Sequence, residues 1–246
     1  MAKNVKDPKE IFPDITADYK DIYGSDLISI MLYGSATGKD YRPGKSDINF
    51  MIVLSEEGIK RLDKAFEIEK KWRKRNVAIP LFLTENYVKT SMDVFPIEYL
   101  NFQRNYTPVY GKDILKDLTF DPKFVRLQCE REIKGKLLLL REAYLETSGK
   151  ARALKHVISQ SIRAFVAIFE ALLHVKGLKL PKEKLQIIRG TAQAFDLDSS
   201  IFEKLLDVKE NKVKLSDDNI RGLFQAYLTE IRKLSKLVDK LGGEDE

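Results

Sequence analysis

Thiols, imidazoles and long apolar runs are scarce in this sequence of 246 residues. Cys129 is the only cysteine, and His156 and His174 are the only histidines. A lone cysteine cannot form a disulfide within the chain, and these three residues are too few for a thiolate or histidine-rich metal cluster. No apolar run approaches the length of about 18 residues that a membrane span needs, so no membrane span is expected.

A secretory signal and a strong charge bias are also missing. The first ten residues, MAKNVKDPKE, are charged and lack an apolar core, so the cytoplasm is the expected compartment. The net charge is only +6, because 43 Lys and Arg are offset by 37 Asp and Glu. The basic run at residues 70–75 is typical of a solvated helix end. The excess would still suit a polyanionic ligand such as a nucleoside triphosphate.

Short apolar runs open the first half of the chain. Residues 14–26 predict a short helix. Residues 27–33 (LISIMLY) and 48–54 (INFMIVL) are apolar runs bounded by turn residues, which predicts two buried strands. The stretch between them holds three Gly and one Pro over residues 34–45, which indicates a loop. Two such strands favour a sheet covered by helices.

Further elements are expected before residue 118. Ser55 followed by two acidic residues is typical of a helix start, and the helical pattern runs to residue 75. A third strand is expected at residues 78–83, where Pro80 favours an edge position. Thr84 starts a short helical turn, and residues 95–102 (FPIEYLNF) predict a fourth strand.

The character of the sequence changes near residue 120, where strand patterns give way to amphipathic helical patterns. No strand pattern interrupts these helices, so an all-α helical bundle domain is expected at residues 119–246, after an N-terminal domain at residues 1–118. The expected fold class is α+β. The predicted helices cover residues 122–145, 150–175, 182–195, 199–208 and 216–241.

The segment most informative about function lies between the first two strands. Gly34 and Ser35 follow the first strand directly, and Asp47 opens the second. A glycine lets backbone N–H groups approach phosphate oxygens, and a serine adds a hydroxyl. Residues two apart in a strand share a face, so Asp47 and Asn49 are expected to project together beside the Gly-Ser turn. A carboxylate there can hold Mg²⁺ that bridges phosphates.

Residues 32–54 resemble the polymerase-beta-like nucleotidyltransferase superfamily, whose motif is Gly-Ser, a variable loop, and a strand with Asp-x-Asp or Asp-x-Glu. The match covers Gly34, Ser35, Ser46 and Asp47. The resemblance implies a mixed sheet with flanking helices, in which Gly34 and Ser35 bind the triphosphate and Asp47 ligates Mg²⁺ or Mn²⁺. ATP is the expected nucleotide.

The resemblance also assigns roles to two further residues. The family's second carboxylate falls at Asn49. Its third acid, a general base or metal ligand on a later strand, is assigned to Glu98. The alternative for Glu98 is an exposed acid on an edge strand. Lys39 and Lys45 lie in the loop, where a solvated side chain is favoured over a phosphate contact.

Asn49 leaves two functions open. Its amide oxygen is a neutral and weaker ligand for a hard cation, so a second metal site should be weakened. One hypothesis is an enzyme that transfers a nucleoside monophosphate to a hydroxyl and releases pyrophosphate. The other is a catalytically degenerate nucleotide-binding or regulatory protein.

The helical second half also resembles that of antibiotic nucleotidyltransferases, including the aminoglycoside-modifying group, and of related bacterial proteins. By this analogy a small-molecule or protein acceptor is preferred. Nucleic acid is not favoured, because the net charge of +6 is spread along the chain and no motif of aromatic and basic residues is evident. No membrane partner is expected, and a homodimer is left open.

Overall fold

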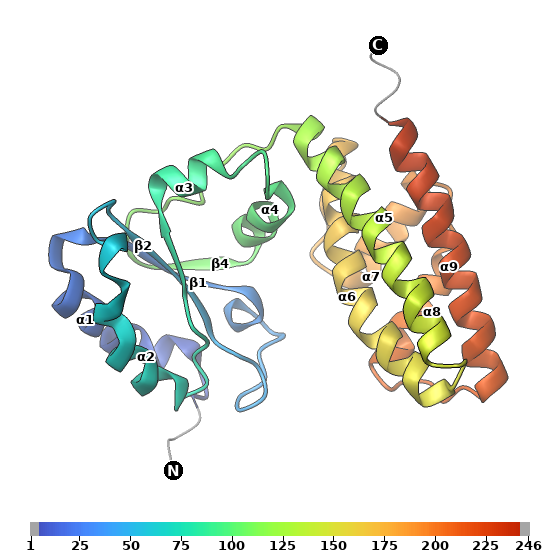
Figure 1. Cartoon of the computed structure of the whole chain (residues 1–246), viewed down its shortest axis with the longest axis horizontal. Coiled ribbons are helices and arrows are strands. Elements are labelled where there is room, and N and C mark those ends of the chain that lie inside the picture. The colour runs from blue at the N-terminus through green and yellow to red at the C-terminus, as the bar shows by residue number, and fades with distance from the viewer. Residues whose placement is uncertain (1–4, 242–246) are drawn as a thin grey trace. The chain divides into compact units, whose positions relative to one another are not determined.

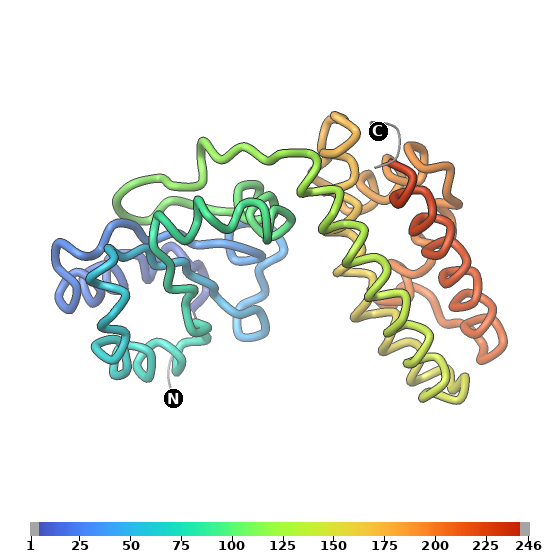
Figure 2. Tube along the Cα trace, turned by 45° about the horizontal axis from the view of Figure 1, so that its top comes forward, coloured from blue at the N-terminus to red at the C-terminus, as the bar shows by residue number. Residues whose placement is uncertain are grey.

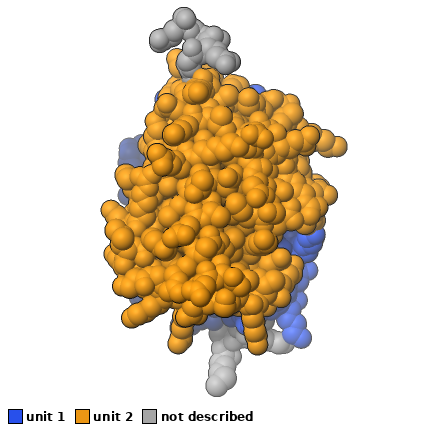
Figure 3. Space-filling model, turned by 90° about the vertical axis from the view of Figure 1, so that its right-hand side faces the viewer, with its two compact units in different colours: residues 1–119 blue, residues 120–246 orange. Residues whose placement is uncertain are grey.

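The chain divides into two compact units, Met1–Thr119 and Phe120–Glu246, which Figure 3 colours separately. A computed structural model describes residues 5–241 of the chain. The first unit holds a sheet with helices on both faces, and the described part of the second unit is helical (Figure 1). The α+β fold class expected from the sequence is therefore confirmed.

A four-stranded mixed sheet forms the centre of the first unit. Its order is β3-β2-β1-β4, with strands β1 (Leu27–Tyr33), β2 (Asn49–Leu54), β3 (Leu81–Thr84) and β4 (Tyr106–Gly111). Strand β1 is antiparallel to β2 and β4, and β2 is parallel to β3. The first two predicted strands are confirmed. The third begins later than expected but occupies an edge of the sheet, as Pro80 indicated.

The fourth predicted strand is wrong. Residues 95–102 lie in a helix, α4 (Pro96–Arg104), in which Asn101 Nδ2 donates to the carbonyl of Ile97 one turn earlier. Pro96 at the first helical position explains the difference, because a proline there loses no helical hydrogen bond but would remove a donor from a strand. The apolar residues that predicted a strand therefore form the buried side of a helix.

The true fourth strand, β4, pairs with β1 through an irregular register. The pairing shifts between Ile30 and Met31, which face Tyr110 and Pro108. Gly111 ends the strand at a φ of +75°, and a Cβ there would lie 2.0 Å from the carbonyl oxygen of Ile28. Only glycine fits this position.

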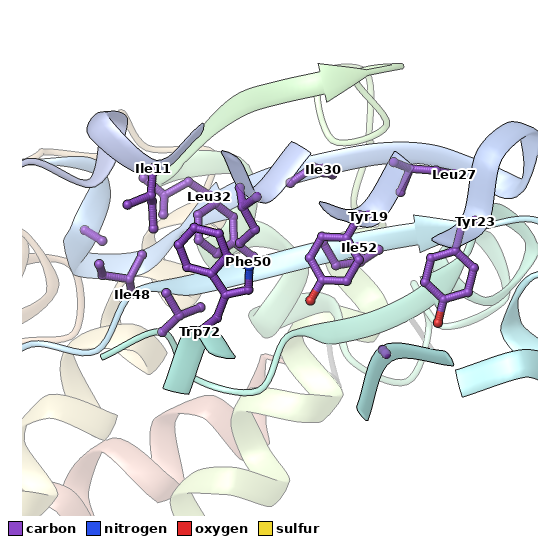
Figure 4. Packing of buried hydrophobic residues seen from close by; sticks show 14 of the residues in the cluster. Ile11, Tyr19, Tyr23, Leu27, Ile30, Leu32, Ile48, Phe50, Ile52 and Trp72 are labelled. Atoms are coloured by element: carbon purple, nitrogen blue, oxygen red, sulfur yellow. The ribbon is translucent and has the colours of Figure 1, made fainter. Parts of the chain in front are cut away.

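One face of the sheet packs against helices α1 (Phe12–Tyr23) and α2 (Phe66–Arg73) (Figure 4). The strands contribute Ile30, Phe50 and Ile52, and the helices contribute Tyr19 and Trp72. Helix α1 follows the short 3₁₀ helix η1 (Pro8–Ile11) and precedes η2 (Gly24–Asp26), so it lies slightly earlier than predicted. The helix expected from Ser55 begins instead as a turn and the 3₁₀ helix η4 (Ile59–Ala65) before α2.

The opposite face of the sheet carries α3 (Glu85–Thr90) and α4 (Figure 1). Met31 and Met51, which alternate with the residues of the first face, are fully buried on this side. The rings of Tyr33 and Phe102 lie 4.8 Å apart, so α4 packs over the end of β1. Thr84 caps α3 by accepting a hydrogen bond from the N–H of Tyr87, as the sequence indicated.

The second unit is a bundle whose helices lie where the sequence predicted them (Figure 2). Its core contains edge-to-face contacts of Tyr227 with Phe165 and Phe202. Helix α6 is long and apolar enough to cross a membrane, and half of its apolar window is buried in the bundle, as is usual for a core helix. The helices are α5 (Pro122–Glu146), α6 (Ala151–Val175), α7 (Lys184–Ala194), α8 (Ser199–Lys209) and α9 (Asp217–Lys240).

Because the hydroxyl of Ser29 is buried, replacing Ser29 by alanine is expected to leave the stability unchanged or to raise it. Ser29 Oγ, in β1, has no hydrogen-bond partner among the described residues. Ser29→Ala should raise the free energy of unfolding by about 0–1 kcal/mol, because it removes an unsatisfied polar group. Ser55→Ala is the matched control. It should cost about 1 kcal/mol, because Ser55 Oγ accepts from the N–H of Gly58 at 2.9 Å. Urea denaturation measures both changes, and a destabilised Ser29→Ala would contradict the prediction.

Glu69 predicts a pH-dependent term in stability. Burial raises the pKa of the Glu69 carboxyl, although a hydrogen bond from the Tyr19 hydroxyl and the charge of Arg73 lower it. The folded chain therefore holds this proton more tightly than the unfolded chain. The stability that this bound proton provides is present below the ordinary pKa of 4.5 and is lost as the pH rises through the pKa of the folded state. As the pH is raised from acidic to neutral, the melting temperature of Glu69→Gln should rise relative to that of the wild type. The exposed neighbour Glu67→Gln should show no such trend.

Candidate functional site

The turn after β1 is held in one conformation by its backbone. Gly34 has a φ of +78°, in the left-handed region that favours glycine. Its N–H donates to the carbonyl of Asn105 at 2.9 Å, and its own carbonyl accepts from the Thr37 hydroxyl at 2.8 Å. The Gly34 amide is therefore used inside the protein. Other groups of the turn must meet any phosphate.

Ser35 lies on the solvent-exposed side of this turn. It lies in the 3₁₀ helix η3 (Gly34–Thr37), and its side chain is exposed. The N–H groups of Ser35 and Ala36 fall in the first turn of η3, where a helix offers no acceptor of its own. The hydroxyl of Ser35 and these two amides are the donors that the turn presents.

The second strand brings Asn49 directly to the Gly34 turn. Asn49 pairs with Tyr33, and its Nδ2 would lie 3.7 Å from a Cβ added to Gly34. Asp47 is exposed and lies two residues earlier, just before the strand begins. Ile48, between them, is buried in the core on the α1 face, so strand alternation places Asp47 with Asn49 on the α4 face. The Gly-Ser turn and the start of β2 thus form one surface.

A second segment lies beside Asp47 through backbone pairing. The N–H of Ile48 donates to the carbonyl of Asn76 at 3.0 Å, and the N–H of Ala78 donates to the carbonyl of Ile48 at 3.0 Å. The turn that follows α2 is therefore adjacent to the start of β2. Nothing in the local sequence indicates this contact, because it joins segments that are far apart along the chain.

Four cationic residues, which we call the basic flank, lie on the two segments that adjoin Asp47 through the backbone. Lys74 and Arg75 precede Asn76, and the Arg75 guanidinium lies 5.2 Å from the centre of the Trp72 ring. Arg42 and Lys45 lie in the loop before Asp47, which is closed by a hydrogen bond from the N–H of Ser46 to the carbonyl of Arg42. None of the four forms a salt bridge among the described residues. This basic flank suits an anionic ligand.

Glu98 is not where the sequence placed it. It lies in the first turn of α4, and its side chain is exposed. Helix α4 covers the face from which Asn49 projects, because Phe102 contacts Tyr33. Strands β3 and β4 contain no acidic residue. A third carboxylate on a strand, as the resemblance implies, is therefore missing.

The ligand set fits one divalent ion better than two. The described residues hold no group of three or more His, Cys, Asp or Glu side chains able to surround a metal. Asp47 offers one carboxylate and Asn49 one amide oxygen. Mg²⁺ in nucleotide sites is commonly held by one or two carboxylates together with substrate phosphates. The surface around Asp47 meets that minimum for a single ion.

Two hollows of the first unit lie apart from the Gly-Ser turn and Asp47. A hollow of about 500 Å³ in the first unit is lined by residues such as Phe82, Thr84 and Tyr87, and a smaller one of about 190 Å³ lies near Lys112. Neither includes Gly34, Ser35 or Asp47.

Comparisons with known proteins find similarity at the level of structure. No protein-family model and no curated protein matches the chain. The chain is similar to the crystal structure of spectinomycin adenyltransferase AAD(9) from Enterococcus faecialis with ATP and spectinomycin. The similarity covers 89% of this chain and 99% of that chain, with 14% sequence identity and a TM-score of 0.47. At this level the similarity assigns no activity to the chain.

Because Gly34 has a left-handed backbone conformation, replacing it by alanine should destabilise the fold, whereas the same change at Gly38 should not. Gly34→Ala should cost about 1–2 kcal/mol of unfolding free energy, because a Cβ is strained at this φ. Gly38→Ala is the control. Gly38 has a φ of −150° and open space around its Cβ position, so its substitution should be neutral. Urea denaturation of both variants measures the difference, and equal stabilities would contradict the strained turn.

Proposed function

We propose that this chain binds a nucleoside triphosphate, ATP by preference, together with Mg²⁺ or Mn²⁺, and transfers its nucleoside monophosphate to a hydroxyl with release of pyrophosphate. One observation carries the proposal. The side chain of Asn49 lies against Gly34, so the Gly-Ser turn and the strand face that bears Asp47 are neighbours. The family motif that residues 32–54 resemble requires this neighbourhood.

The phosphates are assigned to the donors of the turn and to the basic flank. Ser35 offers a hydroxyl, and the amides of Ser35 and Ala36 lack acceptors within η3. Arg42, Lys45 and the Lys74–Arg75 pair supply positive charge beside Asp47. A triphosphate is strongly anionic, so these cations raise its local concentration and offset its charge when it binds.

The metal is assigned to Asp47, with the amide oxygen of Asn49 assisting. A divalent ion there would neutralise phosphate charge that develops during transfer. Glu98 is the proposed acceptor of the hydroxyl proton, because α4 lies over the same face of the sheet. That role requires its carboxylate to come within hydrogen-bond reach of the acceptor hydroxyl.

The acceptor is proposed to be a small molecule or a protein. The net charge is only +6 and the Lys and Arg residues are spread along the chain, so nucleic acid is not favoured. A cytoplasmic location without a membrane partner remains part of the proposal.

A second candidate function is nucleotide binding without transfer. Two observations favour it: Asn49 stands where the family has a carboxylate, and strands β3 and β4 carry no acid. Transfer by two metal ions relies on carboxylates to hold both ions. A regulatory protein that senses the nucleotide would need only the turn, Asp47 and the basic flank.

Calorimetric titration with Mg²⁺ and ATP tests the binding that both functions share. The wild-type chain should bind, and Asp47→Asn should weaken binding about tenfold or more, because it removes the one carboxylate near the phosphates. Asp21→Asn is the control, since Asp21 is exposed on α1 across the sheet. An absence of nucleotide binding by the wild-type chain would contradict both candidates.

Transfer of label from α-labelled ATP to a panel of hydroxyl acceptors separates the two candidates. Transfer by the wild-type chain, abolished by Asp47→Asn, supports the enzyme. Binding without transfer, with transfer gained by Asn49→Asp, supports the nucleotide-binding protein, because the added carboxylate supplies the missing charge.

A further inference from the structure

Helix α5 has an apolar face that the bundle does not use. Its inner side packs against α6 and α9. Four leucines of the helix are exposed: Leu127 is 43% exposed, Leu138 57%, Leu139 63% and Leu145 76%. A solvated helix face normally carries polar residues. The buried residues of the inner side are Val125, Gln128, Cys129, Ile133, Leu137 and Leu140.

Three of the exposed leucines, Leu127, Leu138 and Leu145, lie along one line with a glycine, and Leu139 lies to one side of that line. At 3.6 residues per turn, all six members of this outer stripe fall within about 40° of a single line along the helix. Gly135 is near the middle of the stripe, and a Cβ there would meet nothing within 4 Å. Glycine destabilises a helix interior relative to alanine, so its presence favours a close approach by another chain. The outer stripe consists of Leu127, Arg131, Gly135, Leu138, Glu142 and Leu145.

The outer stripe is complementary to itself when it is reversed. About a point between residues 136 and 137, Gly135 is the counterpart of Leu138, and Arg131 is the counterpart of Glu142. Neither Arg131 nor Glu142 has an ion-pair partner among the described residues. At the ends, Leu127 lies one residue from the position that faces Leu145 of the other copy. The glycine of one copy thus faces a leucine of the other, and the arginine faces a glutamate.

We propose that the outer stripe of α5 binds the same stripe of a second copy of this chain, antiparallel and about a two-fold axis. Such an isologous interface needs a surface that matches itself, which the outer stripe provides. Leu138 of each copy fills the space beside Gly135 of the other. Arg131 of each copy pairs with Glu142 of the other, so the contact contains two ion pairs.

The size of the outer stripe sets the expected strength of the dimer. From Leu127 to Leu145 it runs about 27 Å at 1.5 Å per residue. A single helix stripe buries less surface than the roughly 800 Å² that each partner buries in a standard stable interface. The dimer should therefore be reversible and form at micromolar protein concentrations.

Sedimentation equilibrium of the full chain tests the charge pairing. The wild type should show a monomer–dimer equilibrium without larger species. Arg131→Glu and Glu142→Arg should each weaken association at least about tenfold, because like charges would then face each other twice. The double variant should restore the wild-type association, because it exchanges the two charges and keeps their complementarity.

Gly135→Ala tests the close approach separately from folding. It should raise the thermal midpoint, because alanine favours the helix, and weaken the dimer, because the added methyl occupies the space of Leu138. Gly222→Ala is the matched control. Gly222 is exposed within α9 and its Cβ position is also open, so this change should raise the midpoint and leave the dimer unaffected.

Three results would overturn the proposal. The first is a wild-type chain that stays monomeric at high concentration. The second is a double charge variant that associates no better than the single variants. The third is open-ended assembly, because head-to-tail contacts grow without closing.

Discussion

A single backbone hydrogen bond fixes the part of the first unit to which a function can be assigned. The N–H of Gly34 donates to the carbonyl of Asn105, which ties the end of β1 to the segment between α4 and β4. This bond holds Gly34 at a positive φ and consumes the amide that would otherwise be the first to meet a phosphate. Ser35 follows in η3, and Asn49 is brought to the turn by the pairing of β2 with β1. The turn is thus tied to the rest of the unit at Gly34, and any phosphate would have to meet donors from the residues that follow the glycine.

Charge around that turn is distributed unusually for a metal-dependent transfer site. Asp47 is its one carboxylate at the start of β2, Asn49 adds a neutral oxygen, and four cationic residues lie on the two adjoining segments. Under the proposed function, such a site would neutralise phosphate mainly through protein cations and only in part through a metal. That balance favours tight nucleotide binding over the stabilisation of charge during transfer, because a fixed two-ion arrangement would need more carboxylates.

Helix α5 illustrates how one element can serve two surfaces. Its inner residues complete the core of the bundle, whereas its outer stripe is apolar, contains a glycine and carries opposite charges at matched distances from its centre. Folding of the bundle requires only the inner side. The outer stripe is explained by association, and association through the second unit leaves the Gly-Ser turn of the first unit with its own function.

Local pattern determined much of this protein. The apolar runs of β1 and β2, the capping residue Thr84 and the amphipathic periods of the bundle helices are short-range signals, because the residues involved lie within a few turns of one another. Residues 95–102 show the limit, since an apolar run fits a strand or a helix equally well and only Pro96 distinguishes them. The bond from Gly34 to Asn105, the pairing of Ile48 with the turn after α2, and the placement of Glu98 on a helix over the sheet were decided by tertiary structure. Each joins segments distant along the chain, and such contacts depend on how strands pair and helices pack, which no local spacing encodes.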